Sequence, residues 1–280
     1  MNTNSSITEQ QRQTWNKFSG GWDKWDQWVT NWLADIGEKL LTEAELNKRD
    51  RILDVSTGTG EPGLTAAKRV DQVIATDLAE NMVEIAHKNA EVRGVKNFEA
   101  KTADAESLPF SDNEFDAVIC RLGVMYFANP SAGVQEMARV LKPGRKVALA
   151  AWSEPAKNPW ATVASNAIKE LLNLPTPPSD APGVFRYSRP GLLAELLEQV
   201  SIEDVKQVEV TGDSVFESPE HYWEFVIDVV APIATPLRNA DEATREKAKQ
   251  AIIEASKPYQ QNGKVIMHYA CWVASGRKEK

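Results

Sequence analysis

Cysteine and histidine are scarce in this chain of 280 residues, which has two cysteines and three histidines. Cys120 and Cys271 both lie in strand-like runs, so we expect two buried free thiols rather than a disulfide, and a cytoplasmic location. No group of residues has the spacing of a metal site, so we expect no metal. The Gly-x-Ser-x-Gly pattern and the Cys/His pairs of covalent catalysis are also missing.

Long apolar runs and an excess of positive charge are absent too. No run of about 18 apolar residues predicts a membrane span, and the polar start Met-Asn-Thr-Asn-Ser-Ser lacks the apolar core of a signal peptide. The net charge of -8 and the pI of about 5.1 disfavour nucleic acid as a partner, because phosphate binding needs a basic face. With 42% hydrophobic residues, we expect a globular monomer or homodimer.

The most informative stretch is residues 51–64. Its first part indicates a buried strand, Gly58, Gly60 and Gly63 indicate a tight turn, and a helix follows that would point its first amides at a ligand. The spacing is formally that of a dinucleotide fingerprint. However, Asp54 in the strand and Glu61 at the helix start would repel a diphosphate. S-adenosylmethionine (SAM) carries an ammonium, a sulfonium and no phosphate, so it fits better. The alternative is an ordinary strand–turn–helix corner.

The segment Leu-Asp-Val-Ser-Thr-Gly-Thr-Gly, residues 53–60, resembles motif I of class I SAM-dependent methyltransferases. It is most similar to the ubiquinone/menaquinone-biosynthesis type, although that family usually has glycine where this chain has Ser56. The resemblance covers about Asp50 to Trp152. It implies an α/β, Rossmann-like fold with a seven-stranded, mostly parallel sheet and helices on both faces. The last strand should be antiparallel and lie beside the fifth.

The expected elements follow from the hydrophobic pattern and from the resemblance together. Strands are expected at residues 51–56, 72–77, 95–102, 115–121, 146–152, 205–211 and 264–274. Helices are expected at 8–41, with an interruption at Gly20-Gly21, and at 61–70, 78–93, 131–141, 158–174, 190–200 and 241–256. Residues 142–144 are expected to form a turn, and residues 1–7 and 277–280 to be disordered. We expect an N-terminal helical lid at 1–41 and a SAM-binding core at 42–280. Helical insertions at about 153–188 and 213–260, after the fifth and sixth strands, should build the substrate pocket.

The cofactor residues are expected at the carboxyl ends of the first four strands. Asp77 ends the second strand, where a carboxylate can accept both ribose hydroxyls; capping the next helix is compatible with that role. The resemblance assigns the adenine contacts to Asp104 and the amide of Ala105, and Met82 is expected against the ring. The Arg121 side chain could bind either the methionine carboxylate or a substrate oxygen. The full set is Asp54, Ser56, Thr57, Gly58, Thr59, Gly60, Asp77, Leu78, Met82, Asp104, Ala105, Glu106, Arg121 and Leu122.

Five of the nine tryptophans lie near the N-terminus, at positions 15, 22, 25, 28 and 32, and the last four share one face of a helix. This face either packs on the core or forms a lid over cofactor and substrate. Gly20-Gly21, flanked by Phe18 and Trp22, is a candidate hinge. We expect Phe18 and Trp22, together with Val124, Arg186 and Tyr187, on the substrate side.

The expected chemistry is methyl transfer from SAM to a small, aromatic or apolar acceptor, with release of S-adenosylhomocysteine. The displacement is in line, so the protein mainly aligns the reactants, and a base is needed only if the acceptor must lose a proton. No catalytic residue is identified; the candidates are His221, Tyr126 and Tyr187, whereas His87 is expected to be exposed and His268 structural. The alternatives are an NAD(P)-dependent oxidoreductase, on the glycine spacing and Asp77, and a SAM-binding sensor without turnover.

Overall fold

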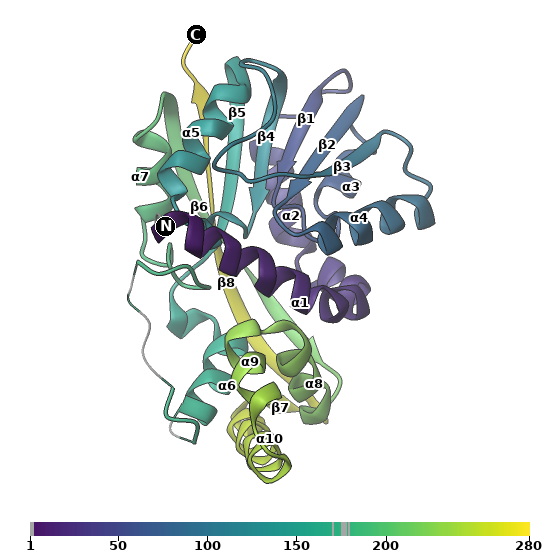
Figure 1. Ribbon diagram of the computed structural model, residues 1–280, viewed down its shortest axis with the longest axis vertical. Coiled ribbons are helices and arrows are strands. Elements are labelled where there is room, and N and C mark those ends of the chain that lie inside the picture. Colours follow the sequence, from purple (N-terminus) through teal and green to yellow (C-terminus); the bar gives the residue numbers. More distant parts are fainter. Residues whose placement is uncertain (1–2, 170, 175–177, 179) are drawn as a thin grey trace.

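The protein is built on an eight-stranded sheet with helices around it (Figure 1). The computed structural model describes residues 3–169, 171–174, 178 and 180–280. The strands follow one another in the order β3-β2-β1-β4-β5-β8-β6, and the short β7 pairs with β8. Their bounds are β1 (Arg51–Val55), β2 (Gln72–Asp77), β3 (Phe98–Thr102), β4 (Phe115–Arg121), β5 (Leu141–Trp152), β6 (Ile202–Phe216), β7 (Gln260–Gln261) and β8 (Lys264–Lys278).

The pairing directions confirm the predicted topology. β1 is parallel to β2 and β4, β2 to β3, and β4 to β5. β8 lies between β5 and β6 and is antiparallel to both. The central strands β1 and β4 are buried along most of their length, as expected of parallel strands that are covered on both faces.

The helices cover both faces because the strand order reverses between β1 and β4. From β1 the chain moves outward to β2 and β3, and from β4 it moves the opposite way to β5, so right-handed crossovers place α3 and α4 on one face and α5 on the other. The helices are α1 (Thr3–Trp32), α2 (Ala34–Glu43), α3 (Gly63–Ala66), α4 (Glu80–Val92), α5 (Pro130–Val140), α6 (Pro159–Lys169), α7 (Leu192–Glu198), α8 (Pro219–Val229), α9 (Ala231–Asn239) and α10 (Glu242–Ser256).

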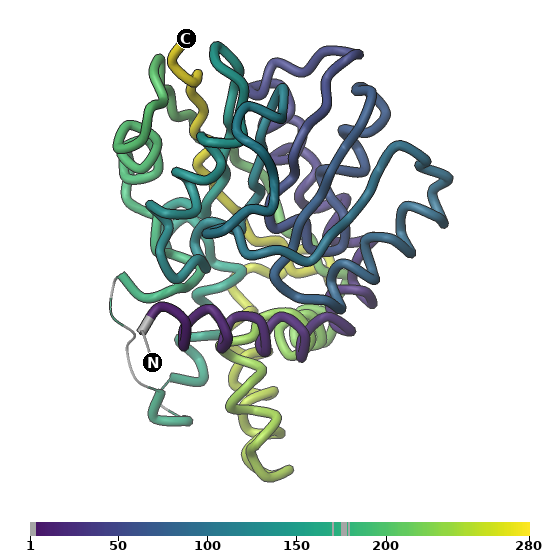
Figure 2. The backbone as a smooth tube through the Cα atoms, turned by 45° about the horizontal axis from the view of Figure 1, so that its top comes forward, coloured from purple at the N-terminus to yellow at the C-terminus, as the bar shows by residue number. Residues whose placement is uncertain are grey.

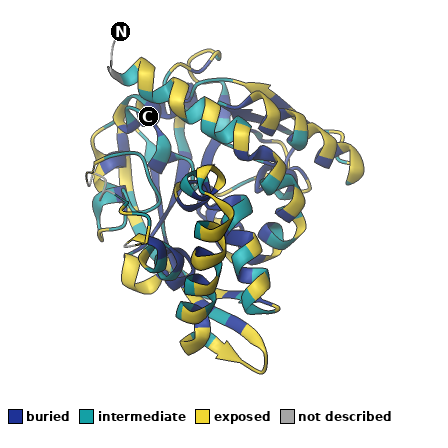
Figure 3. Ribbon diagram, turned by 60° about the horizontal axis from the view of Figure 1, so that its bottom comes forward, coloured by how far each residue is buried: buried dark blue, intermediate teal, exposed yellow. Residues whose placement is uncertain are grey.

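Four helices, α6, α8, α9 and α10, pack together at one end of the sheet, where the long β6–β8 pair extends beyond the other strands (Figure 1). The long α1 runs between this helical group and the sheet (Figure 2). α10 turns the side with Ala248 and Ile252 inward and exposes its outer side (Figure 3). These helices come from the two segments in which the sequence predicted insertions.

α1 differs from its prediction in two ways. It begins at Thr3, so the expected disorder is wrong for residues 3–7, while residues 1 and 2 lie outside the described part. It also continues through Gly20-Gly21, and the break to α2 comes only at Leu33. The predicted interruption is therefore wrong. A Cβ on Gly21 would lie 2.1 Å from the carbonyl oxygen of Asp228, so this glycine permits close packing of α1 on the end of α8.

Other element boundaries also shift. The helix predicted at 61–70 is only the single turn α3, because the glycine turn before it extends to Pro62. The expected turn at 142–144 lies within an irregular start of β5, where the register with β4 shifts. α6 ends at Lys169, before the predicted 174. β6 and β8 are longer than predicted because they pair with each other along almost their whole length. This pairing extends the last strand to Lys278.

Cys120 and Cys271 are buried free thiols, as predicted. None of the described helices combines the length and apolar character that a membrane span requires.

The two adjacent glycines of α1 give a matched pair of variants. Gly21→Ala should destabilise the protein by roughly 1–3 kcal/mol, because the new methyl group meets backbone rather than a movable side chain. A Cβ on Gly20 would have no neighbour within 4 Å, so Gly20→Ala should be neutral or stabilise by about 0.5–1 kcal/mol. Urea unfolding of both variants measures the difference. Equal effects would contradict the close approach of α1 to α8.

Candidate cofactor and substrate site

A cavity of about 570 Å³ lies at the carboxyl ends of the parallel strands. It lies beside the reversal of strand order between β1 and β4, the place where open α/β sheets bind ligands. Its wall combines the loops after β1 to β4 with the end of β5, with α1, and with the α8–α9 junction. The polar loops and the helical part meet in one continuous space.

Twelve of the fourteen predicted cofactor residues line this cavity. They are Ser56, Thr57, Gly58, Thr59, Asp77, Leu78, Met82, Asp104, Ala105, Glu106, Arg121 and Leu122. Asp54 and Gly60 are not in the wall: Asp54 lies behind the glycine turn, and Gly60 is part of the turn itself. The residues that the sequence grouped into one site are therefore also grouped by the fold.

Asp54 holds the glycine turn from behind. Its side chain is fully buried, and Oδ2 accepts hydrogen bonds from the Thr57 hydroxyl at 2.8 Å and from the Gly63 amide at 3.0 Å. Oδ1 is buried without a partner among the described residues. Burial raises the pKa of Asp54 to about 7, although these hydrogen bonds act in the opposite direction. Asp54 thus joins the end of β1 to the first turn of α3.

Left-handed backbone conformations shape the same corner. Gly58 and Gly60 have φ of 58° and 113°, and so do two residues with side chains, Ser56 at 58° and Leu122 at 63°. Such conformations are costly for residues with a Cβ and gather at functional sites. A Cβ on Gly123 would lie 2.4 Å from that of Ser56, so the ends of β1 and β4 touch here. A glycine at position 56 would adopt this backbone without that cost.

Asp77 lies at the end of β2 with its carboxylate on the cavity wall. Oδ2 accepts from the Gly58 amide at 2.9 Å and Oδ1 from the Ala79 amide at 3.0 Å. An ionised carboxylate has about four acceptor positions, so capacity remains for two ligand hydroxyls. Burial raises the pKa of Asp77 to about 6, because the hydrogen bonds offset only part of the desolvation.

The loop after β3 is held by carboxylates in the same manner. Asp104 Oδ1 accepts from the Glu106 amide at 2.9 Å, and Glu106 Oε1 accepts from the Asn129 amide at 2.7 Å, which ties this loop to the one after β4. Burial raises the pKa of Glu106.

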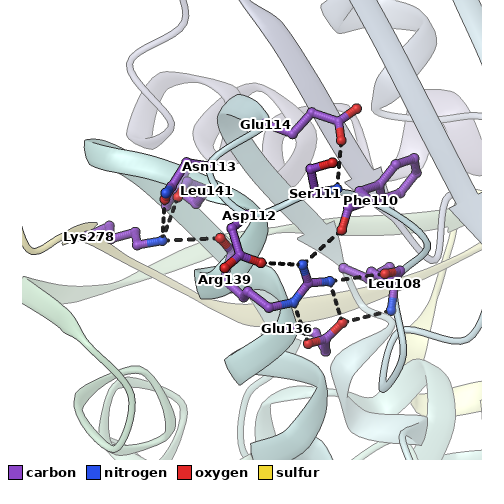
Figure 4. A network of polar contacts seen from close by, with 10 residues as sticks. All are labelled: Leu108, Phe110, Ser111, Asp112, Asn113, Glu114, Glu136, Arg139, Leu141 and Lys278. Carbon is purple, nitrogen blue, oxygen red and sulfur yellow. Dashed lines mark hydrogen bonds and ion pairs between the residues drawn. The ribbon is translucent and has the colours of Figure 1, made fainter.

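Further along, the same loop is anchored by α5 (Figure 4). Arg139 donates to the carbonyl oxygens of Leu108 at 3.0 Å and Phe110 at 2.8 Å, and Glu136 accepts from the Leu108 amide at 2.9 Å. The pair of Glu136 and Arg139 was not predicted from the sequence. Their spacing of three residues could have indicated it, because it places both side chains on one face of a helix.

Arg121 is the cation of the cavity. Among the described residues its guanidinium has no hydrogen-bond or ion-pair partner, and burial lowers its pKa. Its Nη1 would lie 3.7 Å from a Cβ on Gly37 of α2. The nearby Glu61 is instead paired with Arg93, which also pairs with Asp26 at 2.8 Å. Arg121 is therefore available to an anionic group of a ligand.

The other half of the cavity is aromatic and aliphatic. Trp32 stacks on Trp152 with ring centroids 5.5 Å apart, and Tyr126 meets Trp15 edge-on at 4.9 Å. Burial raises the pKa of Tyr126. This half is lined by Trp15, Trp22, Val29, Trp32, Leu33, Met125, Tyr126, Phe127, Trp152, Trp160, Phe225, Val229, Val230, Ala231 and Pro232, among others. From the sequence, Trp22 and Tyr126 were predicted at the substrate, and Trp15 and Trp32 belonged to the tryptophans that were expected to be either core or lid. Most of the remaining residues come from distant segments and were not predicted.

Several other candidates lie outside the cavity wall. Phe18 is buried beside Ala234 with the Arg238 guanidinium over its ring, and Val124 is fully buried. Arg186 donates to the Phe127 carbonyl, and Tyr187 is buried next to it in the chain.

The three histidines are also outside the wall. His221 accepts from the Glu217 amide at 3.3 Å, and its ring packs on Trp25 at 4.7 Å. His87 is exposed, as expected. His268, which was expected to be structural, is exposed on β8 and pairs with Asp213 of β6. Within the described part of the chain, no cluster of His, Cys, Asp and Glu residues could hold a metal ion.

The charges on the wall discriminate between cofactors. Among the described residues, four carboxylates (Glu61, Asp77, Asp104 and Glu106) and the guanidinium of Arg121 line the cavity. This set repels a diphosphate at the glycine turn. It fits a ligand with a ribose, a cationic centre and one carboxylate, which are the features of SAM.

The known proteins that resemble this chain include methyltransferases, in agreement with a site that fits SAM. Residues 52–144 match a family described as a methyltransferase domain. An uncharacterized protein of Mycobacterium tuberculosis is 35% identical over 121 residues, which are 43% of this chain and 44% of that protein. The uncharacterized methyltransferase YcgJ of Bacillus subtilis is 38% identical over 108 residues, 39% of this chain and 42% of YcgJ.

A demethylmenaquinone methyltransferase of Clavibacter sepedonicus is 33% identical over 132 residues, 45% of this chain and 53% of that enzyme. The chain thus spans only about half the length of the curated relatives it matches. The crystal structure of YcgJ superposes on this chain with a TM-score of 0.59 at 21% sequence identity. The superposition covers 88% of this chain and 99% of the YcgJ chain. This likeness shows the fold.

The raised pKa of Asp77 predicts a pH-dependent affinity. Only the ionised carboxylate can accept from two hydroxyls, and with a pKa of about 6 the ionised fraction falls as the pH drops from 7 to 5. Affinity for S-adenosylhomocysteine should then fall by up to about tenfold over this range. Calorimetry measures it. Asp77→Asn should bind more weakly at pH 7 and lack the step near pH 6; a variant that retains this step would assign it to another group.

Proposed function

We propose that this chain, which contains a class I SAM-dependent methyltransferase domain, transfers the methyl group of SAM to a small apolar or aromatic acceptor. The family and the cofactor predicted from residues 53–60 are confirmed by the domain match, the methyltransferases among the relatives and the fold. The observation that carries the proposed reaction is the continuity of a polar, carboxylate-lined half with an aromatic half in one cavity.

Each part of the cofactor has a matching place in the polar half. The Asp77 carboxylate accepts from the ribose hydroxyls, Asp104 accepts from the adenine amino group, and Met82 packs on the ring. Arg121, which lacks a partner among the described residues, pairs with the methionine carboxylate rather than with a substrate oxygen, because it faces the corner of α2 and α3. Of the two roles that the sequence left open for Arg121, we therefore propose the first.

The bound cofactor supplies an activated methyl group, which the acceptor's nucleophile takes while the carbon–sulfur electron pair stays on sulfur. The chain's own residues orient the two reactants and exclude water. The aromatic half stacks a flat or apolar acceptor against Trp15, Trp152 or Trp160. Its described lining contains no charged side chain, and burying a charged acceptor there without a counter-charge would be costly.

Tyr126 is the candidate that touches both the acceptor half and the cofactor loops. Because burial raises its pKa, the phenol stays protonated at neutral pH, so it donates a hydrogen bond and does not act as a base. We assign it the task of orienting the acceptor. His221 and Tyr187 lie outside the cavity wall and receive no role in the reaction.

We also propose a lid function for the first part of α1. Thr8, Gln11, Thr14 and Trp15 line the cavity from this helix, opposite the α8–α9 junction. Access to the aromatic half therefore depends on how closely α1 is packed. Since α1 is continuous through Gly20-Gly21, movement involves the helix as a unit or fraying from its N-terminus.

The proposed activity is tested by incubating the protein with SAM and a panel of neutral aromatic and aliphatic acceptors, with release of S-adenosylhomocysteine as the readout. Charged analogues of the same acceptors provide the matched control and should react poorly. Binding of S-adenosylhomocysteine without turnover on any acceptor would favour the sensor alternative. Tight binding of NAD instead would favour the oxidoreductase.

Tyr126→Phe tests the assignment of the phenol. The variant retains the ring but loses one hydrogen bond worth about 1 kcal/mol, so the KM of the acceptor should rise roughly fivefold. The Kd of S-adenosylhomocysteine should stay unchanged. Tyr259→Phe, at a position outside the cavity wall, controls for removal of a phenol. A loss of cofactor affinity in Tyr126→Phe, or an unchanged acceptor KM, would contradict this role.

A further inference from the structure

The N-cap residue of helix α4 makes no side-chain cap. This residue, Ala79, has an extended backbone and no side chain that can accept from the first amides. A helix N-terminus leaves such amides unsatisfied unless another group accepts from them. α4 follows directly on Asp77 and Leu78, and its first turn carries Met82, so the position of its start determines the cofactor wall.

Asn16 of α1 supplies the missing cap from a distant part of the chain. Its Oδ1 accepts from the Asn81 amide at 3.0 Å, which is the amide of the second helical residue that an N-cap side chain normally satisfies. Its Nδ2 donates to Glu80 Oε2 at 2.7 Å. The Asn81 side chain donates back to the Asn16 carbonyl at 3.2 Å. In each of these three hydrogen bonds a donor therefore faces an acceptor.

Further contacts hold α1 along α4. Arg12 Nη1 donates to the second oxygen of Glu80 at 2.9 Å, and Lys88 pairs with Asp23 at 2.8 Å. On its other side α1 is fixed to α8 by Lys24 and the Trp25 indole, which both reach Asp228. The same helix thus contacts the cofactor side through α4 and the acceptor side through its tryptophans.

We propose that Asn16 is a positioning residue for the cofactor, acting through the start of α4. The proposal rests on the proposed SAM-binding function. By capping α4 from α1, Asn16 fixes the segment from Asp77 to Met82, in which the Ala79 amide donates to Asp77 Oδ1. The lid helix therefore contributes to adenosine affinity as well as to the acceptor half.

A thermodynamic consequence follows from this coupling. If docking of α1 increases cofactor affinity, then cofactor binding must stabilise the docked α1 by the same factor. Loss of the cap should appear in the binding of S-adenosylhomocysteine and in the KM of SAM. The kcat at saturating SAM and acceptor should stay close to that of the wild type.

The first experiment measures S-adenosylhomocysteine binding to Asn16→Ala by calorimetry. We expect a Kd roughly three- to tenfold weaker than that of the wild type, as for loss of a helix cap. Asn16→Asp should recover only part of the affinity, because its carboxylate still accepts from the Asn81 amide but repels the Glu80 carboxylate to which Asn16 donates. Gln27→Ala is the matched control, since this exposed amide of α1 bonds only to Asn31 among the described residues.

The outcomes separate this inference from the function on which it rests. If the wild type does not bind S-adenosylhomocysteine, the proposed function itself is wrong. If the wild type binds and Asn16→Ala binds within twofold of it, the positioning role is refuted even if the variant melts at a lower temperature. Equal weakening by Gln27→Ala would likewise refute it, because that variant leaves α4 untouched.

A second experiment needs no variant. Hydrogen exchange of the wild type should slow several-fold at residues 8–20 of α1 and in the first turn of α4 when S-adenosylhomocysteine is added. α10, which lies outside the cavity wall, provides an internal reference. Unchanged exchange in α1 with saturating ligand would overturn the coupling.

Discussion

The buried carboxylate of Asp54 is the constraint on which the glycine turn depends, and it begins a pattern that repeats after β2 and β3. Asp54 accepts from the Gly63 amide, Asp77 from the Gly58 and Ala79 amides, and Glu106 from the Asn129 amide. Irregular loops at the top of a sheet leave backbone amides without partners, and carboxylates satisfy these with strong hydrogen bonds. The loops are thereby tied to one another as well as to the sheet.

Burying these carboxylates has an electrostatic cost, and this cost affects which ligands the site can bind. The folded-state pKa values of Asp54 and Asp77 are raised from 3.8 to about 7 and about 6. At a pH between the unfolded and the folded pKa, the native state binds more protons than the unfolded state. The contribution of these two carboxyl groups to the free energy of unfolding is therefore present below about pH 4 and lost as the pH rises through 6 to 7. At neutral pH the empty site holds poorly solvated negative charge. A cationic ligand with hydroxyl donors relieves this cost, whereas a diphosphate would increase it.

The cofactor half could be predicted from the sequence and the acceptor half could not. Each cofactor loop is one contiguous strand–turn segment, so residue pattern and spacing place Asp77 or Asp104 at a strand end without knowledge of the rest. The acceptor half joins Trp15, Trp152 and Phe225 from three distant segments that only the packing of α1 on the helical group brings together. The predicted helix interruption at Gly20-Gly21 was wrong for the same reason. Gly21 allows close packing against Asp228, which is distant in the sequence and cannot be found from the local pattern.

The tryptophan face of α1 was predicted to be either core or lid, and the structure places part of it in the core and part of it at the cavity wall. Trp25 and Trp32 are buried, and with Trp28 they pack among Phe216, Phe225 and Trp152, whereas Trp15 and Trp22 meet edge-on beside the cavity, which Trp32 also lines. The C-terminal half of α1 is therefore fixed by aromatic packing. The N-terminal half is held mainly by the exposed polar contacts that Arg12 and Asn16 make with the start of α4. A helix anchored firmly at one end and weakly at the other can open at its N-terminus without disturbing the core, and it needs no glycine hinge to do so.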